Sequence, residues 1–137
     1  METIFTKIIR GDIPCYKVAE DDRFFAFLDI NPLAEGHTLV VPKNPIDYFF
    51  DIENQELGEM IIFAKKIAIA IKENFPCQKV GMTVIGLEVP HAHIHLIPIN
   101  QVHDMDFRRK KLKLTPERFE EIAKCLRETK SLNNNSC

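Results

Sequence analysis

The sequence predicts an α+β domain with an antiparallel meander sheet of about five strands, one long helix on a face of the sheet, and a C-terminal helix. Three observations lead to this prediction. Five short segments have the residue types and bounding turns of strands. Most of them are joined by short connections, which favours antiparallel pairing. Two longer segments carry apolar residues at helical spacing, so each offers one face to a sheet.

Length and composition limit the class of protein. The 137 residues are most simply one domain, residues 1–137, and 45% hydrophobic residues suffice for a core. The net charge of −2 gives no reason to expect a nucleic-acid polymer or a membrane as the partner. The four cysteines are widely spaced, and neither a secretory leader nor an apolar run of about 18 residues is evident. We therefore expect a cytoplasmic protein with reduced thiols.

The first half of the chain predicts a short helix and three strands. Residues 3–14 have apolar residues at helical spacing, and this short helix is closed by Gly11 and Pro14. The three strands are expected at residues 15–20, 23–30 and 37–43. In the second strand Phe25, Phe27 and Asp29 share one side, because side chains alternate across a strand.

The second half predicts the two main helices and the last two strands. A long helix is expected from a cap at Asp51 to about Phe75. Its apolar face consists of Leu57, Met60, Ile61, Ala64, Ile67, Ala68 and Ile71. Two strands follow at residues 79–86 and 91–99. Thr115 and Pro116 are a strong helix start, so the C-terminal helix is expected at about 116–130, before a tail that frays.

The segment "VPHAHIHLIPIN" places three of the five histidines, His91, His93 and His95, at alternate positions. On a strand these side chains point to one face, and the apolar residues between them point to the other, toward the helix. Packing therefore explains the apolar residues but not the imidazoles. One interpretation is structural: the histidines are polar residues on a half-buried strand that are either solvated or satisfied by hydrogen bonds within the protein.

Two functional interpretations compete with the structural one. Histidines two residues apart on a strand have Cβ atoms about 6.6 Å apart and can share a metal ion, but all three cannot comfortably surround one ion. A metal site would need two of them and a remote ligand such as His37 or Glu88. Alternatively, the row binds a phosphate group through its N–H groups, while one neutral nitrogen is the nucleophile. The middle residue, His93, has a neighbour on each side and suits that role.

The pattern "HAHIHLI" resembles the signature of the histidine triad (HIT) family of nucleotide-binding hydrolases and transferases. Three further segments, "IFTKIIRGDIP", "FFAFLDINP" and "EGHTLVVPK", precede it in the order found in that family. The resemblance covers residues 3–100. It implies an antiparallel sheet with helices, a homodimer in which two sheets join, and cleavage or transfer at the α-phosphate of nucleotide derivatives.

The resemblance also implies roles for individual residues. His93 resembles the nucleophile that forms a nucleotidyl-histidine intermediate, and His95 the residue that contacts phosphate oxygens and helps the leaving group. His91 and His37 resemble residues that orient the site. Asp29 resembles the acidic residue that holds the ribose hydroxyls. The walls around the base, a purine by this resemblance, match Phe5, Ile8, Phe27 and Ile30.

Three features depart from the family pattern or lie outside it. The loop before the triad, "VIGLEVPH", is short, with Ile85 in place of an Asn and Glu88 in place of a Ser or Gln. Thr3 and Thr6 occupy the positions of a zinc-binding Cys-x-x-Cys found in some relatives, so no such zinc is expected. The basic run 108–113 is interpreted as a solvated loop, with the alternative that it helps to attract the negative charge of a nucleotide.

The sequence thus predicts a homodimeric nucleotide hydrolase or transferase, such as a nucleoside phosphoramidase, without a metal or other cofactor. Its substrates would be phosphoramidates, dinucleoside polyphosphates or similar compounds. The alternative is a non-catalytic nucleotide-binding or interaction protein of the same fold, because binding needs the base pocket and Asp29 but no leaving-group chemistry.

Overall fold

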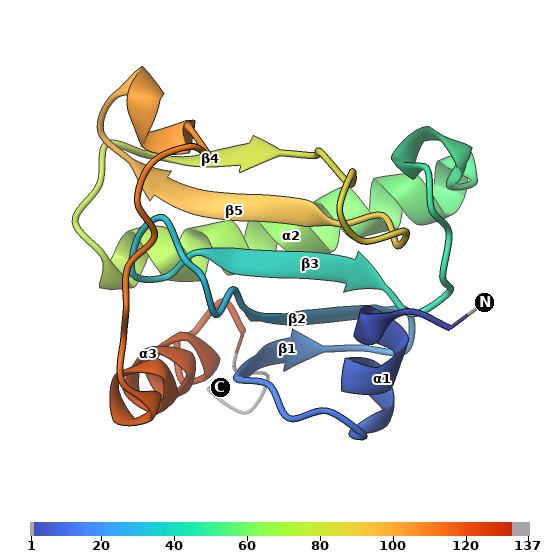
Figure 1. The fold of residues 1–137 in the computed structure, drawn as a ribbon, viewed down its shortest axis with the longest axis horizontal. Coiled ribbons are helices and arrows are strands. Elements are labelled where there is room, and N and C mark those ends of the chain that lie inside the picture. Colours follow the sequence, from blue (N-terminus) through green and yellow to red (C-terminus); the bar gives the residue numbers. More distant parts are fainter. Residues whose placement is uncertain (1, 133–137) are drawn as a thin grey trace.

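The computed structural model describes residues 2–132, so the last part of the predicted frayed tail lies outside the described residues. Its centre is a five-stranded antiparallel sheet, as predicted (Figure 1). The strands are β1 (Lys17–Glu20), β2 (Phe24–Leu28), β3 (Thr38–Pro42), β4 (Lys79–Thr83) and β5 (Ile94–Ile99).

The strand order, β1-β2-β3-β5-β4, departs from the predicted meander at the last hairpin. β5 lies between β3 and β4 and pairs with both. The burial of the two strands explains this order. The first four residues of β5 are buried on both faces of the sheet, whereas β4 includes Gly81 and is only partly covered. The more apolar strand therefore occupies the inner position, and β4 is left at the edge.

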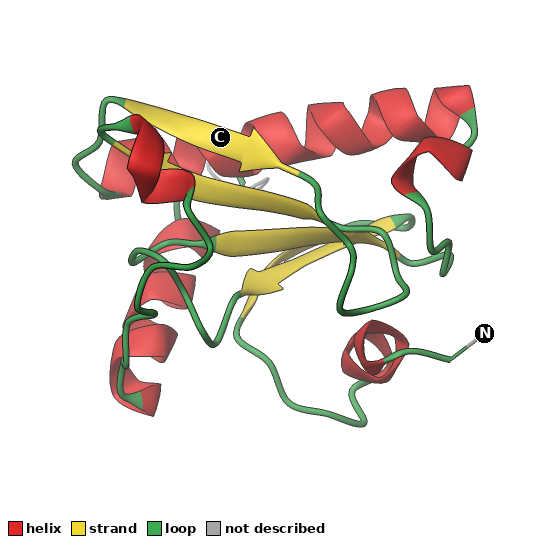
Figure 2. Ribbon diagram, turned by 45° about the horizontal axis from the view of Figure 1, so that its top comes forward, coloured by secondary structure: helices red, strands yellow, loops and turns green. Residues whose placement is uncertain are grey.

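Helices lie on both faces of the sheet (Figure 2). α2 (Asn54–Asn74) and α3 (Pro116–Arg127) pack on one face, and α1 (Ile4–Arg10) packs on the other. The predicted cap at Asp51 was wrong. Asp51 ends a short 3-10 helix, η1 (Phe49–Asp51), and Glu53 caps α2 by accepting a hydrogen bond from the amide of Gln55 at 3.1 Å.

Successive side chains of β2 point to opposite faces of the sheet, and they divide the core into two layers. Phe24, Ala26 and Leu28 face α2 and α3 and belong to the larger layer. Phe25 and Phe27 face the other side and pack in a smaller layer with α1. The division confirms the predicted assignment of alternate residues to opposite faces. The smaller layer lies beside the histidines, so α1 is the element that brings apolar side chains to the site.

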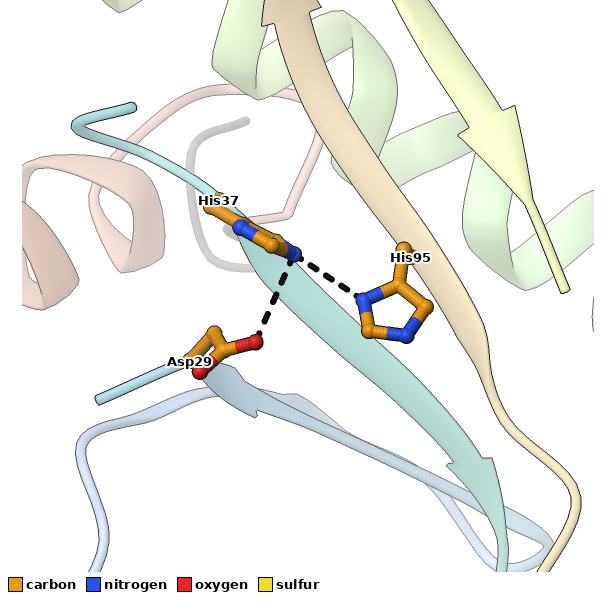
Figure 3. Close-up of side chains that lie close together, drawn as sticks. All are labelled: Asp29, His37 and His95. Carbon is orange, nitrogen blue, oxygen red and sulfur yellow. Dashed lines mark hydrogen bonds and ion pairs between the residues drawn. The ribbon is translucent and has the colours of Figure 1, made fainter. Parts of the chain in front are cut away.

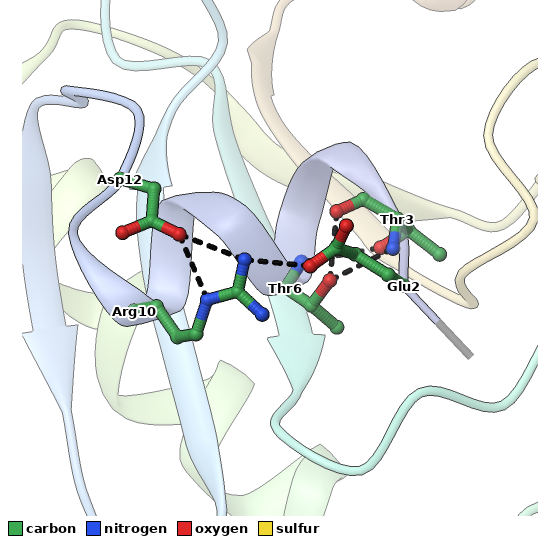
Figure 4. A network of polar contacts seen from close by, with 5 residues as sticks. All are labelled: Glu2, Thr3, Thr6, Arg10 and Asp12. Carbon is green, nitrogen blue, oxygen red and sulfur yellow. Dashed lines mark hydrogen bonds and ion pairs between the residues drawn. The ribbon is translucent and has the colours of Figure 1, made fainter.

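Polar contacts at both ends of α1 hold this short helix (Figure 4). Thr3 and Thr6 exchange side-chain and backbone hydrogen bonds at the N-terminus, a capping box. Gly11 ends the helix in the left-handed region, at φ 88°, where glycine meets no steric penalty. Arg10 forms ion pairs with Glu2 and Asp12 on the exposed surface. Within residues 2–132, no helix has the length and apolar character needed to cross a membrane.

Candidate active site

β5 begins at Ile94, so the predicted strand 91–99 is too long at its start, and His91 and His93 precede the strand. The backbone amides of residues 91 and 92 form hydrogen bonds outside the sheet. The amide of His91 donates to the carbonyl of Val89 at 2.8 Å, and the amide of Ala92 donates to the carbonyl of Ile46 at 2.6 Å. The triad therefore occupies a turn and the first residues of a strand.

The three histidines are buried, with exposed fractions of 0% for His91, 6% for His93 and 8% for His95. The solvated form of the structural interpretation was therefore wrong, whereas a residue satisfied by hydrogen bonds within the protein describes His91. His93 and His95 line a cavity of about 520 Å³ that opens between α1, β2 and the loop before the triad. The same cavity is lined by all five residues predicted to bind the nucleotide: Phe5, Ile8, Phe27, Asp29 and Ile30.

His91 does not line the cavity; it lies behind it and is held at both ring nitrogens. Its Nε2 atom is 2.7 Å from the carbonyl oxygen of Pro42, which can only accept, so Nε2 carries the proton. Nδ1 is then an acceptor for the Thr3 hydroxyl at 2.8 Å. Burial lowers the pKa of His91, which favours this neutral form. His91 thereby joins the cap of α1 to the end of β3.

His93 has the opposite tautomer. Its Nδ1 atom donates to the carbonyl oxygen of His91 at 2.8 Å, so Nε2 is the lone-pair nitrogen of the ring. The Phe5 ring packs edge-on against the imidazole, with 5.0 Å between the centroids. Burial lowers the pKa of His93, while the carbonyl of His91 and the charge of Glu88 act in the other direction. The site thus holds an unprotonated imidazole nitrogen at neutral pH.

His95 and His37 form a hydrogen bond whose donor and acceptor can be assigned (Figure 3). The amide of Leu33 donates to Nδ1 of His37 at 3.0 Å, so the proton of this ring is on Nε2. That Nε2–H donates to Nδ1 of His95 at 3.0 Å, and His95 in turn carries its proton on Nε2. Burial lowers the pKa of His37 to about 3 and that of His95 to about 4, so both rings are neutral at pH 7.

Asp29 lies beside this pair. One carboxylate oxygen is 3.5 Å from Nε2 of His37, and the other accepts the amide of Asn31 at 2.8 Å. Burial raises the pKa of Asp29, and the amide of Asn31 and the charge of Lys111 oppose this rise. Asp29 follows the end of β2, where it faces the cavity between the apolar wall and His37.

Asp29, His37 and His95 place one potential ligand atom each within 4.8 Å of one another, a spacing that a metal ion could bridge. The hydrogen bonds argue against this use. A neutral imidazole binds a metal through an unprotonated nitrogen, and the amide of Leu33 puts the His37 proton on the nitrogen that faces the other two groups. The close approach is therefore explained by the hydrogen bond from His37 to His95 and by the Asp29 carboxylate, which lies 3.5 Å from the same Nε2 atom of His37.

Two residues that line the cavity are absent from the predicted set of site residues, although one of them belongs to the basic run 108–113. Phe107 packs against His95 and His37, with centroid distances of 4.8 Å and 6.0 Å. Lys111 lines the cavity, and its ammonium donates to the carbonyls of Phe107 and Arg109. The interpretation of 108–113 as a solvated loop holds for Arg108, which is exposed, and is wrong for Lys111.

Glu88 and Ile85 also line the cavity, so the short loop before the triad forms part of its wall. Glu88 is exposed and lies near enough to His93 for its negative charge to raise the pKa of that imidazole. The two residues of this loop that differ from the family pattern therefore line the site.

The fold and the site together define a histidine-triad protein, and comparisons with known proteins agree. The HIT domain model matches residues 10–102, so the chain belongs to the HIT family. An uncharacterized HIT-like protein of Borreliella burgdorferi is 38% identical, over 89% of this chain and 94% of its own. The adenosine 5′-monophosphoramidase of Schizosaccharomyces pombe is 37% identical, over 72% of this chain and 74% of its own.

The fold comparison extends the match beyond the family domain. The crystal structure of a HIT-like protein involved in cell-cycle regulation from Bartonella henselae superposes with a TM-score of 0.79 and 34% identity. The match covers 92% of this chain and 94% of the other. The resemblance found in the sequence is thereby confirmed at the level of family and fold.

Proposed function

We propose that this protein is a nucleotide hydrolase or transferase that acts at the α-phosphate of nucleoside phosphoramidates, dinucleoside polyphosphates or related compounds. The observation that carries the proposal is the pair of opposite tautomers on one cavity. His93 offers an unprotonated Nε2, and His95 offers an Nε2–H. A nucleophile and a hydrogen-bond donor at the same phosphate are the minimum requirement for displacement at phosphorus.

The rest of the cavity suits a nucleotide. Phe5, Ile8 and Phe27 give one apolar wall, for which a purine base is the proposed occupant. Ile30, at 64% exposed, would cover the outer edge of that base. Asp29 would accept hydrogen bonds from the ribose hydroxyls through the carboxylate that already accepts the amide of Asn31. The α-phosphate would then lie at His93 and His95.

The proposed reaction has two displacements. Nε2 of His93 forms a bond to the α-phosphorus, and the bond from phosphorus to the leaving group breaks. The electron pair goes to the leaving atom, which His95 Nε2–H stabilises and which takes up a proton from solvent. Water then attacks the phosphorus of the nucleotidyl-histidine and releases a proton to solvent. The N–P bond breaks, its electron pair returns to Nε2, and the nucleoside monophosphate leaves. A second acceptor in place of water would give transfer.

The experiment for this proposal is to trap the intermediate. Wild-type protein mixed with an adenosine 5′-phosphoramidate and quenched in acid or base during turnover should carry adenylate on the peptide that contains His93. His93→Ala should bind adenosine monophosphate with a similar Kd and lose roughly 10³-fold or more in kcat. Wild-type turnover by purified His93→Ala would show that another group is the nucleophile.

The second candidate is a non-catalytic nucleotide-binding protein. The observation in its favour is Glu88, whose negative charge lies near His93 and opposes an approaching phosphate. The named activity of the Schizosaccharomyces pombe relative favours catalysis instead. The trapping experiment separates the two, because a binding protein would show nucleotide affinity with neither a covalent adduct nor a product.

A homodimer is also proposed. The outer edge of β4 has no strand partner within residues 2–132, and Met82 on that strand is 52% exposed. On α2, Ile62 and Ile69 are 61% and 41% exposed. A second copy that covers these apolar side chains and extends the sheet at β4 would bury both features. Sedimentation should give a dimer, and Ile62→Asp should shift it toward monomer.

A further inference from the structure

We propose that Glu88 makes this protein selective for nucleoside phosphoramidates whose leaving amine carries a second, positively charged group on an aliphatic stem. This inference rests on the proposed function and narrows its substrate class. Glu88 would select the leaving group, and its negative charge would disfavour leaving groups that carry additional phosphates.

The first support is the position of Glu88. Its loop lines the cavity on the side of His93, and the neighbouring residue, Val89, fixes the backbone there. Val89 packs against the apolar layer beneath α1, and its carbonyl accepts the amide of His91 at 2.8 Å. Within residues 2–132 the Glu88 carboxylate forms no ion pair, so its negative charge is available to a ligand.

The second support is the distribution of charge in the cavity wall. Three of the described lining residues carry a carboxyl or ammonium group: Asp29, Glu88 and Lys111. Lys111 influences Asp29 and His37, whereas Glu88 influences His93 as well as Asp29. Of these two residues, only Glu88 therefore acts on the nucleophile His93, whereas Lys111 acts on Asp29 and His37.

The third support is the apolar surface next to Glu88. Leu87 is 90% exposed and Ile85 is 46% exposed, and both line the cavity with it. Exposed aliphatic side chains around a single carboxylate suit a leaving group with a methylene stem and a terminal cation, because the stem packs while the charge is neutralised. A diamine or a lysine-like side chain has this chemistry, and a polyphosphate has the opposite charge.

The experiment uses three adenosine 5′-phosphoramidates that differ only in the end of a six-carbon amine stem. The stem ends in a methyl group, an ammonium group or a carboxylate. Wild-type kcat/KM should rank ammonium above methyl above carboxylate, by about fivefold at each step, the size of an exposed ion pair. The preference should shrink at high salt, because exposed charges are screened.

The variants test whether Glu88 is the cause. In Glu88→Gln the ratio of kcat/KM for the ammonium and carboxylate substrates should fall toward one, and Glu88→Lys should invert it. The ratio cancels any general loss of activity in either variant. Glu117→Gln is the matched control, because it removes an exposed glutamate outside the cavity, on α3, and should keep the wild-type ratio.

The outcomes separate this inference from the proposed function. If wild-type protein cleaves none of the three substrates, the proposed function fails. If it cleaves them all with equal efficiency, or if Glu88→Gln keeps the wild-type ratio, the function stands and the inference about Glu88 is wrong.

Discussion

The backbone amide of Leu33 determines which nitrogen of His37 is protonated, and His37 in turn sets the tautomer of His95. The two bonds in this series are each 3.0 Å long. An amide N–H cannot accept, so Nδ1 of His37 must, and each later proton position follows from that one. The β2–β3 loop thereby determines that His95 presents a donor, and not a lone pair, to the cavity.

The first prediction concerns this relay. His37→Ala should lower kcat/KM by about 10- to 100-fold, because His95 loses the donor that fixes its tautomer. His37→Gln should recover part of the loss, because its amide N–H₂ reaches the place of the histidine Nε2–H. The ¹⁵N chemical shifts of His95 should show Nε2 protonated in the wild type and a mixture of tautomers in His37→Ala. Unchanged shifts in His37→Ala would contradict the relay.

The second prediction concerns pH and stability. Burial lowers the pKa of His37 to about 3 and that of His95 to about 4, below the ordinary value of 6.5. At a pH between 6.5 and these lowered pKa values, the two histidines bind protons in the unfolded chain but not in the folded protein. The free energy of unfolding therefore decreases as the pH falls below 6.5, by about 1.4 kcal/mol per pH unit for each histidine.

Urea denaturation at pH 7 and pH 5.5 measures this effect. His37→Gln removes one of the contributing groups, so its loss of stability over that interval should be smaller than that of the wild type by about 1 kcal/mol. The same loss in both proteins would mean that His37 is already protonated in the folded state at pH 5.5.

Local patterns predicted the elements of the fold because each pattern has a short-range cause. The helical spacing in α2 and the proline start of α3 are local, and both helices are found. The order of β4 and β5 is not local, because it depends on which strand buries more of its surface in the completed sheet. The cap of α2 moved from Asp51 to Glu53 because a turn of 3-10 helix intervenes.

The sequence indicated most of the residues that converge on the cavity but not their geometry. The spacing of His91, His93 and His95 and the family resemblance named most of the groups that meet at the cavity. The alternating pattern implied one row of equivalent imidazoles, but His91 is turned to Thr3 and Pro42.

Lys111 and Phe107 reach the site because their segment makes a long-range contact. The amide of Leu112 donates a hydrogen bond to the carbonyl of Pro32 at 2.9 Å. No short-range signal reports such a contact.

The third prediction concerns the connection between α1 and the triad. The hydroxyl of Thr3 both accepts the amide of Thr6 at 3.1 Å and donates to His91. Thr3→Val keeps the shape but removes both bonds and leaves Nδ1 of His91 buried without a donor. We expect it to lower the free energy of unfolding by about 2 kcal/mol. Thr3→Ser keeps the hydroxyl and should stay within about 0.5 kcal/mol of the wild type; equal effects of the two would assign the loss to packing.

The fourth prediction concerns metal. A metal enzyme with an ion at Asp29, His37 and His95 would contain about one ion per chain and lose activity in chelator. We expect neither, because an ion there must displace the Nε2 proton of His37. The proton would then have to occupy Nδ1, where it faces the donor amide of Leu33. Elemental analysis of purified protein, with turnover of an adenosine phosphoramidate before and after dialysis against chelator, measures both quantities. Activity that disappears in chelator and returns with added zinc would show that the hydrogen-bonded pair is not the active arrangement.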